Sequence, residues 1–263
     1  MKTSLIITTY NWKEALSAVL DSVLYQSILP DEVIIADDGS RDDTKNLINE
    51  LQKEYPISLI HSWQADIGFR AAESRNRAIS KATGDYIIII DGDIVLPPSF
   101  VASHINNAKQ GQFIQGGRVL LNKERTDEVL KRHKIPKIWQ SGLKNRHNTI
   151  NCKQLSSMFS KISNSDRSTR SCNMSFWLSD IKKVNGFNND FVGWGREDSE
   201  FVLRLLNSGV NRLYLKFAGA GYHLYHKENS RMSLPKNDQL LKNTISSKST
   251  YCENGLNEIK ETK

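Results

Sequence analysis

The clearest structural signal in the sequence is the segment Tyr86-Ile87-Ile88-Ile89-Ile90-Asp91-Gly92-Asp93. Its run of isoleucines predicts a strand over 86–90 that is buried on both faces, as is typical of a parallel sheet covered by helices. Two carboxylates separated by one small residue follow the strand directly. Ligands of open α/β sheets bind beyond the carboxyl ends of the strands, so this acidic pair stands where a ligand is expected.

The residues before this strand alternate between strand and helix signals. Apolar runs predict further strands over 4–9, 32–37 and 57–63, and apolar residues at helical spacing predict helices over 16–24, 42–51 and 71–82. Ser40 is expected to cap the second of these helices. The alternation predicts a doubly wound, mostly parallel α/β sheet.

Polar residues follow three of the predicted strands, and we expect them to converge on one site. They are Thr8-Thr9-Tyr10, Asp37-Asp38 and Asp91-Gly92-Asp93. Carboxylates in such a turn are often only structural or solvated. At the end of a buried strand, however, they suit a hard Mg²⁺ or Mn²⁺ ion that bridges a diphosphate.

The second half of the chain is less regular. Residues 119–165 are rich in Lys, Arg, Asn and Ser, and we expect a long insertion or flexible loop region with short helices. A helix is predicted from Arg196 or Glu197 to about Asn207, with Gly209 as its stop. The polar tail from about Asn237 is expected to be partly disordered.

Charge is unevenly distributed along the 263 residues. Residues 1–117 hold 10 Lys and Arg against 15 Asp and Glu, a net charge of −5, whereas residues 118–263 hold 26 against 14, a net charge of +12. The basic half could be an ordinary solvated surface, or it could attract an anionic lipid or glycan. Nucleic acid is not an expected partner, because no motif of a known reader is present.

Targeting segments and cysteine content indicate the cellular compartment in which the protein is expected. The N-terminus has neither the long apolar region nor the cleavage site of a signal peptide, and no run of about 18 apolar residues predicts a membrane span. The three cysteines, Cys152, Cys172 and Cys252, are far apart and odd in number, so we interpret them as reduced thiols. A cytoplasmic location is therefore expected.

Several further residues are candidates for chemistry. His223 and His226 are spaced so that one or both could bind the metal, and imidazole would favour Mn²⁺ over Mg²⁺, although isolated histidines are more often ordinary surface or core residues. Arg70 and Arg75 open a predicted helix, where they suit a phosphate or, equally, surface ion pairs. Trp194 lies between two glycines, in a loop that could present a flat ring to a sugar.

The acidic segment after this loop offers candidates for a general base. Glu197 and Asp198 lie about 100° apart on the predicted helix and should point to different partners. Asp198 shares its side with Phe201 and Val202, so we expect it to be the more enclosed of the two and to be ionised at neutral pH. Ordinary charge at a helix N-terminus is the alternative explanation of these acids.

Taken together, these motifs resemble a known family. Over roughly residues 3–232 the chain is similar to family 2 glycosyltransferases, with a C-terminal galactosyltransferase-type segment shared with β-1,4-galactosyltransferases and bacterial chondroitin-type polymerases. The matching segments are Thr8-Thr9-Tyr10-Asn11, Asp37-Asp38-Gly39-Ser40, Gly68-Phe69-Arg70-Ala71-Ala72, Arg75-Asn76, Gly84-Asp85, Asp91-Gly92-Asp93, Cys172-Asn173-Met174-Ser175-Phe176, Asn185-Gly186-Phe187 and Gly193-Trp194-Gly195-Arg196-Glu197-Asp198.

The resemblance implies a role for each candidate residue. Asp38 would contact uracil, Thr9 and Tyr10 would line the nucleoside pocket, and Arg70 would face the diphosphate or ribose, with Arg75 beside it. Asp91 would bond the ribose or a metal-bound water, and Asp93 and His226 would ligate the metal. The galactosyltransferase pattern has methionine where this chain has His223, so one histidine or both would bind. Trp194 would stack on sugars, Glu197 would hold sugar hydroxyls, and Asp198 would be the base. Arg196 stands where many relatives carry glycine, which implies a different acceptor pocket.

The resemblance therefore implies a GT-A-type fold and an inverting, Mn²⁺- or Mg²⁺-dependent transfer of a hexose or N-acetylhexosamine from a UDP-sugar to a saccharide or lipid-linked glycan. Residues 1–117 would bind the nucleotide sugar, residues 118–236 would bind the acceptor, and 237–263 would be a tail. A lipid-linked acceptor would bring peripheral association with the inner face of the cell membrane, in the setting of surface polysaccharide or lipopolysaccharide synthesis.

Two alternatives remain at this point. A sugar-nucleotide nucleotidyltransferase would need a glycine-rich phosphate loop where Thr8-Thr9-Tyr10-Asn11 stands. A non-enzymatic basic glycan-binding protein would leave the acidic clusters at three strand ends unexplained.

Overall fold

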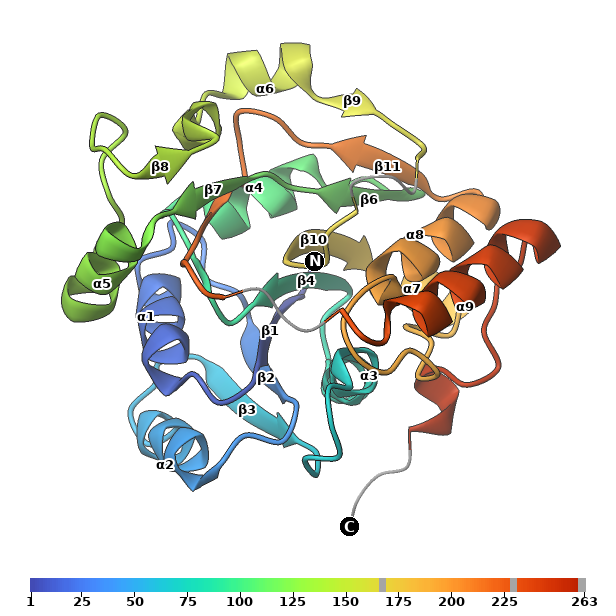
Figure 1. Cartoon of the computed structure of the whole chain (residues 1–263). Coiled ribbons are helices and arrows are strands. Elements are labelled where there is room, and N and C mark those ends of the chain that lie inside the picture. The colour runs from blue at the N-terminus through green and yellow to red at the C-terminus, as the bar shows by residue number, and fades with distance from the viewer. Residues whose placement is uncertain (166–168, 228–230, 260–263) are drawn as a thin grey trace.

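The computed structural model describes residues 1–165, 169–227 and 231–259, and its central feature is an eight-stranded sheet (Figure 1). Strands β1 to β4 run parallel to one another, whereas β10 is antiparallel to both of its neighbours. The prediction of a doubly wound, mostly parallel α/β sheet is confirmed. The order across the sheet is β3 (Ser58–Trp63), β2 (Glu32–Asp37), β1 (Thr3–Thr9), β4 (Tyr86–Asp91), β10 (Asn173–Trp177), β6 (Gln112–Gln115), β11 (Asn211–Tyr214), β9 (Lys161–Ile162).

Both faces of the sheet are covered, which explains the isoleucine run in β4. Ile88 and Ile90 belong to one hydrophobic core and Ile87 and Ile89 to another, because successive side chains of a strand point to opposite faces. All four are fully buried, and each stabilises the fold by about 1.5–3 kcal/mol. The strand that carries the acidic pair is thus rigidly anchored.

Helices pack on the two faces in separate groups (Figure 1). The first core takes side chains from α1 (Lys13–Leu24), α2 (Asp42–Leu51) and α4 (Phe100–Asn107). The second takes them from α3 (Ala71–Lys81), α7 (Leu178–Lys183) and α8 (Glu197–Asn207). The predicted bounds of α2 and α8 agree with the structure.

The prediction that Ser40 caps α2 is wrong. Arg41 occupies the N-cap position, and its side chain makes no capping hydrogen bond. The Ser40 hydroxyl instead accepts a hydrogen bond from the backbone N–H of Asn11 at 2.9 Å. It therefore ties the loop after β2 to the loop after β1.

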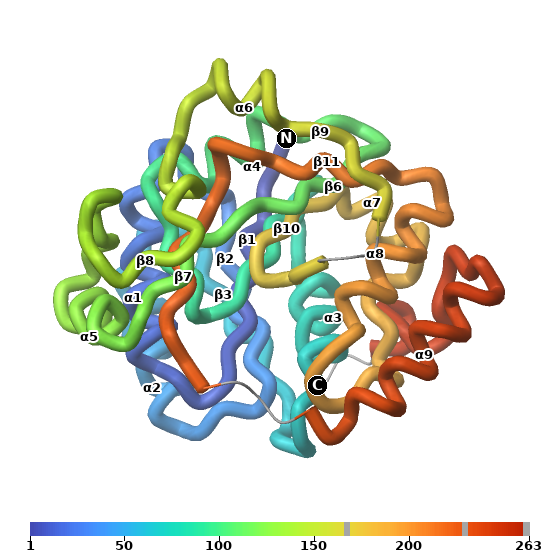
Figure 2. The backbone as a smooth tube through the Cα atoms, turned by 45° about the horizontal axis from the view of Figure 1, so that its top comes forward, coloured from blue at the N-terminus to red at the C-terminus, as the bar shows by residue number. Residues whose placement is uncertain are grey.

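A second, smaller sheet lies beside the first and contains β5 (Ile94–Val95), β12 (Gly221–His223), β7 (Arg118–Leu121) and β8 (Leu143–Lys144). The orange segment that follows β11 runs back beside β7 in Figure 2. Strand β12 is consequently held between β7 and β5. This return path brings residues near position 223 next to the residues that follow β4.

The region 119–165 has more regular structure than the expected flexible loop. Helix α5 (Lys123–Arg132) begins at Asn122, whose side chain accepts a hydrogen bond from the Arg125 N–H. The short elements η1 (Arg146–Thr149), α6 (Lys153–Phe159) and β9 follow it. Only Thr126 and Val129 of α5 are buried, and this sparse apolar spacing explains why the sequence pattern was weak.

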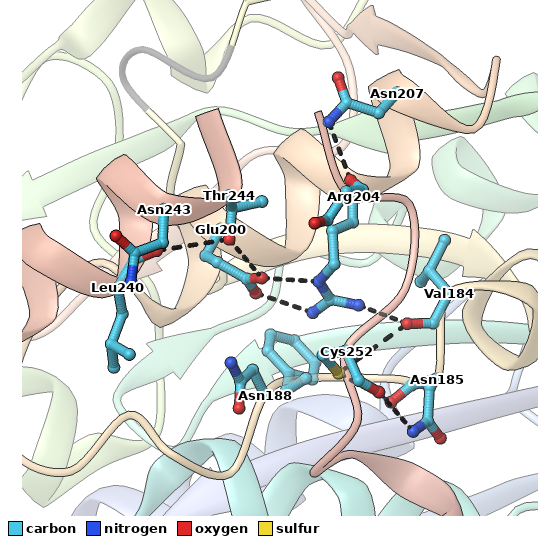
Figure 3. Close-up of polar contacts among 12 residues, drawn as sticks. Val184, Asn185, Asn188, Glu200, Arg204, Asn207, Leu240, Asn243, Thr244 and Cys252 are labelled. Carbon is cyan, nitrogen blue, oxygen red and sulfur yellow. Dashed lines mark hydrogen bonds and ion pairs between the residues drawn. The ribbon is translucent and has the colours of Figure 1, made fainter. Parts of the chain in front are cut away.

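The expectation of a partly disordered tail is wrong for its described residues. Helix α9 (Leu234–Ser247) packs on α8, and its Leu241 and Thr244 are buried; η2 (Leu256–Glu258) packs against α3. Figure 3 shows the polar network beneath α9. There Arg204, whose side chain is 0% exposed, pairs with Glu200 at 2.7 Å.

This network attaches α8 to segments that precede it and follow it in the chain. The Arg204 guanidinium donates to the carbonyl oxygens of Val184 and Gly186, and the Thr244 hydroxyl of α9 donates to Glu200 (Figure 3).

Among the described residues, no helix is both long and apolar enough to cross a membrane. Cys152, Cys172 and Cys252 are free thiols, as expected.

Candidate active site

The loops after β1, β2 and β4 meet at one edge of the sheet, as predicted. In the sheet register Thr8 lies opposite Asp91, and Thr9 lies opposite Asp37. The buried Thr9 also accepts the Asp38 N–H through its carbonyl oxygen at 3.0 Å. A Cβ atom at Gly92 would lie 2.7 Å from the Thr8 carbonyl oxygen, so this close approach requires glycine.

Asp38 lies at the nucleoside end of the site that the resemblance implies. Its carboxylate accepts the backbone N–H of Arg70 at 2.8 Å and the side-chain amide of Gln64 at 2.6 Å. Burial raises the pKa of Asp38 to about 6, although these two hydrogen bonds act to lower it. Tyr10 is half exposed nearby, and its hydroxyl donates to Asp66 at 3.0 Å.

Asp93, His223 and His226 form a cluster that could hold a metal ion. The pairing of β12 with β5 places His223 opposite Ile94, and the Leu224 N–H donates to the Asp93 carbonyl. The Nε2 atoms of His223 and His226 consequently lie 3.6 and 3.2 Å from Asp93 Oδ2. One ligand atom from each of the three residues lies within 4.8 Å of the others.

Several observations fit a divalent cation at this cluster. The Oδ1 atom of Asp93 is buried without a hydrogen-bond partner. His226 Nδ1 lies 2.7 Å from the Lys227 carbonyl oxygen and donates to it, which leaves Nε2 directed at Asp93. The hydrogen bond to Asp93 raises the pKa of His226 to about 9, whereas burial lowers that of His223; a bound cation would take the place of the proton on His226 Nε2. Both histidines therefore offer Nε2 toward one carboxylate, and the mixed N and O donor set suits Mn²⁺.

Arg75 links the two halves of the chain. It is almost fully buried, and its guanidinium lies 3.4 Å from Asp91 and 3.2 Å from Glu197, above the Phe187 ring. Arg70, by contrast, keeps a partly exposed side chain that pairs with Glu73 at 3.2 Å. Arg75 therefore orients two carboxylates of the site, while Arg70 stays closer to solvent.

Asp198 lies at the start of α8, next to Glu197. Its carboxylate accepts the Ser171 N–H at 3.3 Å and the Ser199 N–H at 2.7 Å. The expectation that Asp198 is the more enclosed of the pair is wrong: Glu197 is buried through its pairing with Arg75, and Asp198 is partly exposed.

The protonation of Asp198 also differs from the expectation. Although part of Asp198 reaches solvent, the protein around its carboxylate removes water from the charged group, and this desolvation, followed by the charge of Glu197, raises the pKa of Asp198 to about 7. The ionised and protonated forms therefore coexist near neutral pH. A group with such a pKa is well suited to accept a proton, because a general base works best when its pKa lies near the operating pH.

The loop before α8 carries Trp194, whose side chain is 39% exposed and lies under the guanidinium of Arg231. The Gly193 N–H donates to the Phe69 carbonyl oxygen at 2.8 Å, so the loop is tied to the first half of the chain. Arg196 adopts a left-handed φ of +79° and pairs with Asp238 at 2.6 Å. That conformation favours glycine, which agrees with the glycine that the resemblance implies at this position.

The sequence patterns gave no reason to select some residues that shape the site. Gln64 and Asp66 contact Asp38 and Tyr10 from the loop after β3, and Ser171 contacts Asp198. These contacts depend on how loops meet in space. Only the acidic residue at 66, three positions beyond the end of a predicted strand, offered a signal of the kind that marked the other clusters.

The central, mostly parallel sheet with helices on both faces has the architecture of the GT-A glycosyltransferases. Residues 4–164 match "Glycosyl transferase family 2", and residues 153–227 match "N-terminal domain of galactosyltransferase". The chain belongs to glycosyltransferase family 2.

Curated relatives are longer than this chain. It is 28% identical over 223 residues to the hyaluronan synthase of Pasteurella multocida, in an alignment that covers 78% of this chain and 23% of the synthase. It is 25% identical over 250 residues to the chondroitin synthase of Escherichia coli, with 86% of this chain and 34% of that enzyme covered. The chain thus spans about a quarter of one of these relatives and about a third of the other.

Solved structures support the same fold. S. aureus TarS 1-349 in complex with UDP matches with a TM-score of 0.62 and 17% identity, over 93% of this chain and 65% of that one. The mannosyltransferase PcManGT from Pyrobaculum calidifontis, in complex with GDP-Man and Mn²⁺, matches with a TM-score of 0.59 and 16% identity, over 86% and 58%. Both likenesses establish the GT-A fold.

Proposed function

We propose that this chain transfers a hexose or N-acetylhexosamine from a UDP-sugar to a glycan acceptor, with inversion and with Mn²⁺ or Mg²⁺, in bacterial surface polysaccharide or lipopolysaccharide synthesis. The observation that carries the proposal is the cluster of Asp93, His223 and His226. It lies beside Asp91, whose charge acts on both histidines.

Residues 1–117 would hold the nucleotide sugar. Asp38 and Tyr10, with Thr9 beside them, line the position proposed for uracil, and Arg70 lies at the start of α3, where an anionic diphosphate is favoured. Support comes from the structures of the same fold that hold UDP in one case and GDP-Man with Mn²⁺ in the other. Residues 118–236 would hold the acceptor, with Trp194 stacking on the sugars.

The metal would be held by Asp93, His226 and His223. When bound, it would neutralise charge that develops on the departing diphosphate. Glu197, fixed by Arg75, would accept hydrogen bonds from sugar hydroxyls.

Asp198 would be the general base. An acceptor hydroxyl would pass its proton to the Asp198 carboxylate while its oxygen bonds to the anomeric carbon. The bond between that carbon and the diphosphate oxygen would break on the opposite side, which inverts the configuration. Ser171 and Ser199 hold the carboxylate in place through their N–H groups.

Chelation should abolish sugar transfer, and added Mn²⁺ should restore it, because two diphosphate charges must be neutralised beside Asp91 and Asp93. The measurement is UDP release and sugar transfer from a panel of UDP-sugars, with EDTA and then with Mn²⁺. Asp93→Asn should weaken metal-dependent UDP binding by about tenfold or more, since even residues behind the ligands contribute about 10–100-fold to metal affinity.

Asp198→Asn is the matched control for that variant, because it removes a carboxylate of the same site that does not touch the metal cluster. It should leave UDP binding nearly intact. Full activity in excess EDTA, or equal UDP binding by the wild type and Asp93→Asn, would contradict the metal assignment. Failure to turn over any UDP-sugar would contradict the donor class.

Peripheral association with a membrane stays a prediction from the charge of residues 118–263. Each cation near an anionic surface contributes about 1 kcal/mol, so binding should fall steeply with salt. Sedimentation with anionic liposomes at low and high ionic strength tests it, and an absence of sedimentation at low salt would contradict it.

A further inference from the structure

A second concave feature lies next to the proposed base. It is a polar cavity of about 280 Å³, lined by the turn between β6 and β7, the segment around η1, the residues before β10 and the end of β11. Among the described residues, none that lines the cavity is acidic. Those that could recognise a ligand through charge or hydrogen bonds are Arg118, Arg170, His147, Asn145 and Tyr214.

The cavity is connected to the proposed active site through one short segment. Arg170 and Cys172 line the cavity, and Ser171 between them donates its N–H to Asp198. Arg118 also lies close to the metal cluster, since the pairing of β7 with β12 places it opposite Gly221, two residues before His223. The cavity therefore lies on the side of the base, where an acceptor must enter.

The cavity has a surplus of positive charge. Within the described parts of the chain, neither Arg118 nor Arg170 forms an ion pair, whereas the buried Arg75 and Arg204 are both paired with carboxylates. The Arg118 guanidinium donates a hydrogen bond to the Cys172 thiol at 3.7 Å. Two guanidinium groups that have no ion-pair partner among the described residues suit an oxyanion.

The surrounding contacts hold this arrangement in place. Asn148 donates to the Arg118 carbonyl oxygen at 2.9 Å, and the Arg170 N–H donates to Gln115 at 3.2 Å. The backbone atoms of both arginines are thus fixed, and both residues line the cavity. A Cβ atom at Gly116 would lie 2.4 Å from the Asn173 amide, so this turn, which also lines the cavity, depends on glycine.

We propose that this cavity binds an anionic group of the acceptor glycan, either the carboxylate of a uronic acid or a phosphate, through Arg118 and Arg170. This inference rests on the proposed function, because it assigns the acceptor of the same site. A negatively charged donor sugar is a less suitable occupant, since the residues proposed for the nucleotide follow β1 and β2, whereas the cavity borders Asp198.

The test measures binding of three matched disaccharides in the presence of UDP and Mn²⁺ by NMR titration. They differ only in one residue, which is glucose, glucuronate or glucose 6-phosphate. At least one anionic disaccharide should bind about tenfold or more tightly than the neutral one, because hydrogen bonds to charged groups contribute about 1.5–3 kcal/mol. Preference for glucuronate or for the phosphate identifies which oxyanion the cavity selects.

Variants then assign the preference to the cavity. Arg118→Gln and Arg170→Gln should each reduce the ratio of anionic to neutral affinity, and the double variant should remove most of it. Because the ratio is measured within one protein sample, a loss of folded protein cannot imitate the effect. Arg146→Gln is the matched control: Arg146 is a neighbouring exposed arginine that bonds the Gln140 carbonyl and does not line the cavity, so the ratio should persist.

Equal binding of all three disaccharides, or a preference that persists in the double variant, would overturn the inference. Turnover of UDP-sugars is a separate readout that reports on the proposed function. If no UDP-sugar is used, the proposed function fails whatever the disaccharides do. If a UDP-sugar is used but charge has no effect on binding, only the assignment of the cavity fails.

Discussion

Asp198→Asn is expected to lower kcat by about 10²–10⁴-fold, because the amide keeps the size of the carboxylate but cannot accept the acceptor's proton. The Ser199 N–H can still donate to the amide oxygen, while the weaker hydrogen bond from the Ser171 N–H, at 3.3 Å to the other oxygen, is lost, so the start of α8 should keep its structure. Donor affinity should change little. Steady-state kinetics with a UDP-sugar and UDP titration of the variant measure the two effects.

The matched control is Asp190→Asn, which removes an exposed carboxylate from the loop that leads to Trp194. Its kcat should stay close to that of the wild type. The wild-type product should have the β configuration when the donor is α. An Asp198→Asn enzyme within about threefold of the wild type, or a product that keeps the donor's configuration, would show that the base or the mechanism is misassigned.

A pH profile distinguishes removal of the catalytic carboxylate from a change in its position. Burial and the charge of Glu197 raise the pKa of Asp198 to about 7, so the active ionised form is depleted below that pH. The wild-type kcat/KM should therefore rise with pH through about 7. In Asp198→Asn the low residual rate should lack this limb, whereas a merely displaced carboxylate would keep it.

Arg204→Met is expected to lower the free energy of unfolding by about 3–5 kcal/mol, because it leaves the charge of Glu200 buried without its partner. The Glu200 side chain is 2% exposed, and the carbonyl oxygens of Val184 and Gly186 lose their donor as well (Figure 3). Urea denaturation followed by circular dichroism measures the change.

Arg196→Met is the matched control for this prediction. It breaks the ion pair with Asp238, which also joins the α8 end to α9 but lies at the surface, with side chains 43% and 37% exposed. Exposed pairs contribute about 0.2–1 kcal/mol, so this variant should lose no more than that. The double variant Glu200→Leu/Arg204→Met should recover part of the lost stability, and a full additive loss would contradict the buried-charge explanation.

Local patterns were sufficient to predict most of the fold. The isoleucines of β4 face two cores in alternation, and the helix over 197–207 followed from the spacing of Phe201, Val202 and Leu205. The tail could not be predicted because few apolar residues mark α9. Its attachment depends on Thr244 bonding to Glu200, a contact between residues 44 positions apart that no local pattern contains.

The sequence was sufficient to predict which residues lie in the candidate site, but not how buried each one is or which side chains it contacts. Asp93, His223 and His226 come together, as the resemblance implied, because β12 pairs with β5. The relative burial of Glu197 and Asp198 was predicted wrongly, because helical phase alone ignores the buried Arg75 that draws Glu197 inward. The cavity beside Asp198 was also missed, since its arginines come from segments about 50 residues apart.

The buried Arg75 makes the two halves of this enzyme depend on each other for charge compensation. Its charge is shared between Asp91 of the first half and Glu197 of the second, and the neighbouring Asn76 exchanges hydrogen bonds with the backbone of Phe187. A chimaera that takes residues 118–259 from another family member would have to supply an acid at the position of Glu197. Otherwise the buried Arg75 guanidinium would lose one of its two carboxylate partners. Recombination between relatives is therefore constrained where residues of the first and second halves meet around Arg75. Engineering of acceptor specificity is best confined to loops that leave Arg75 and its two carboxylates together.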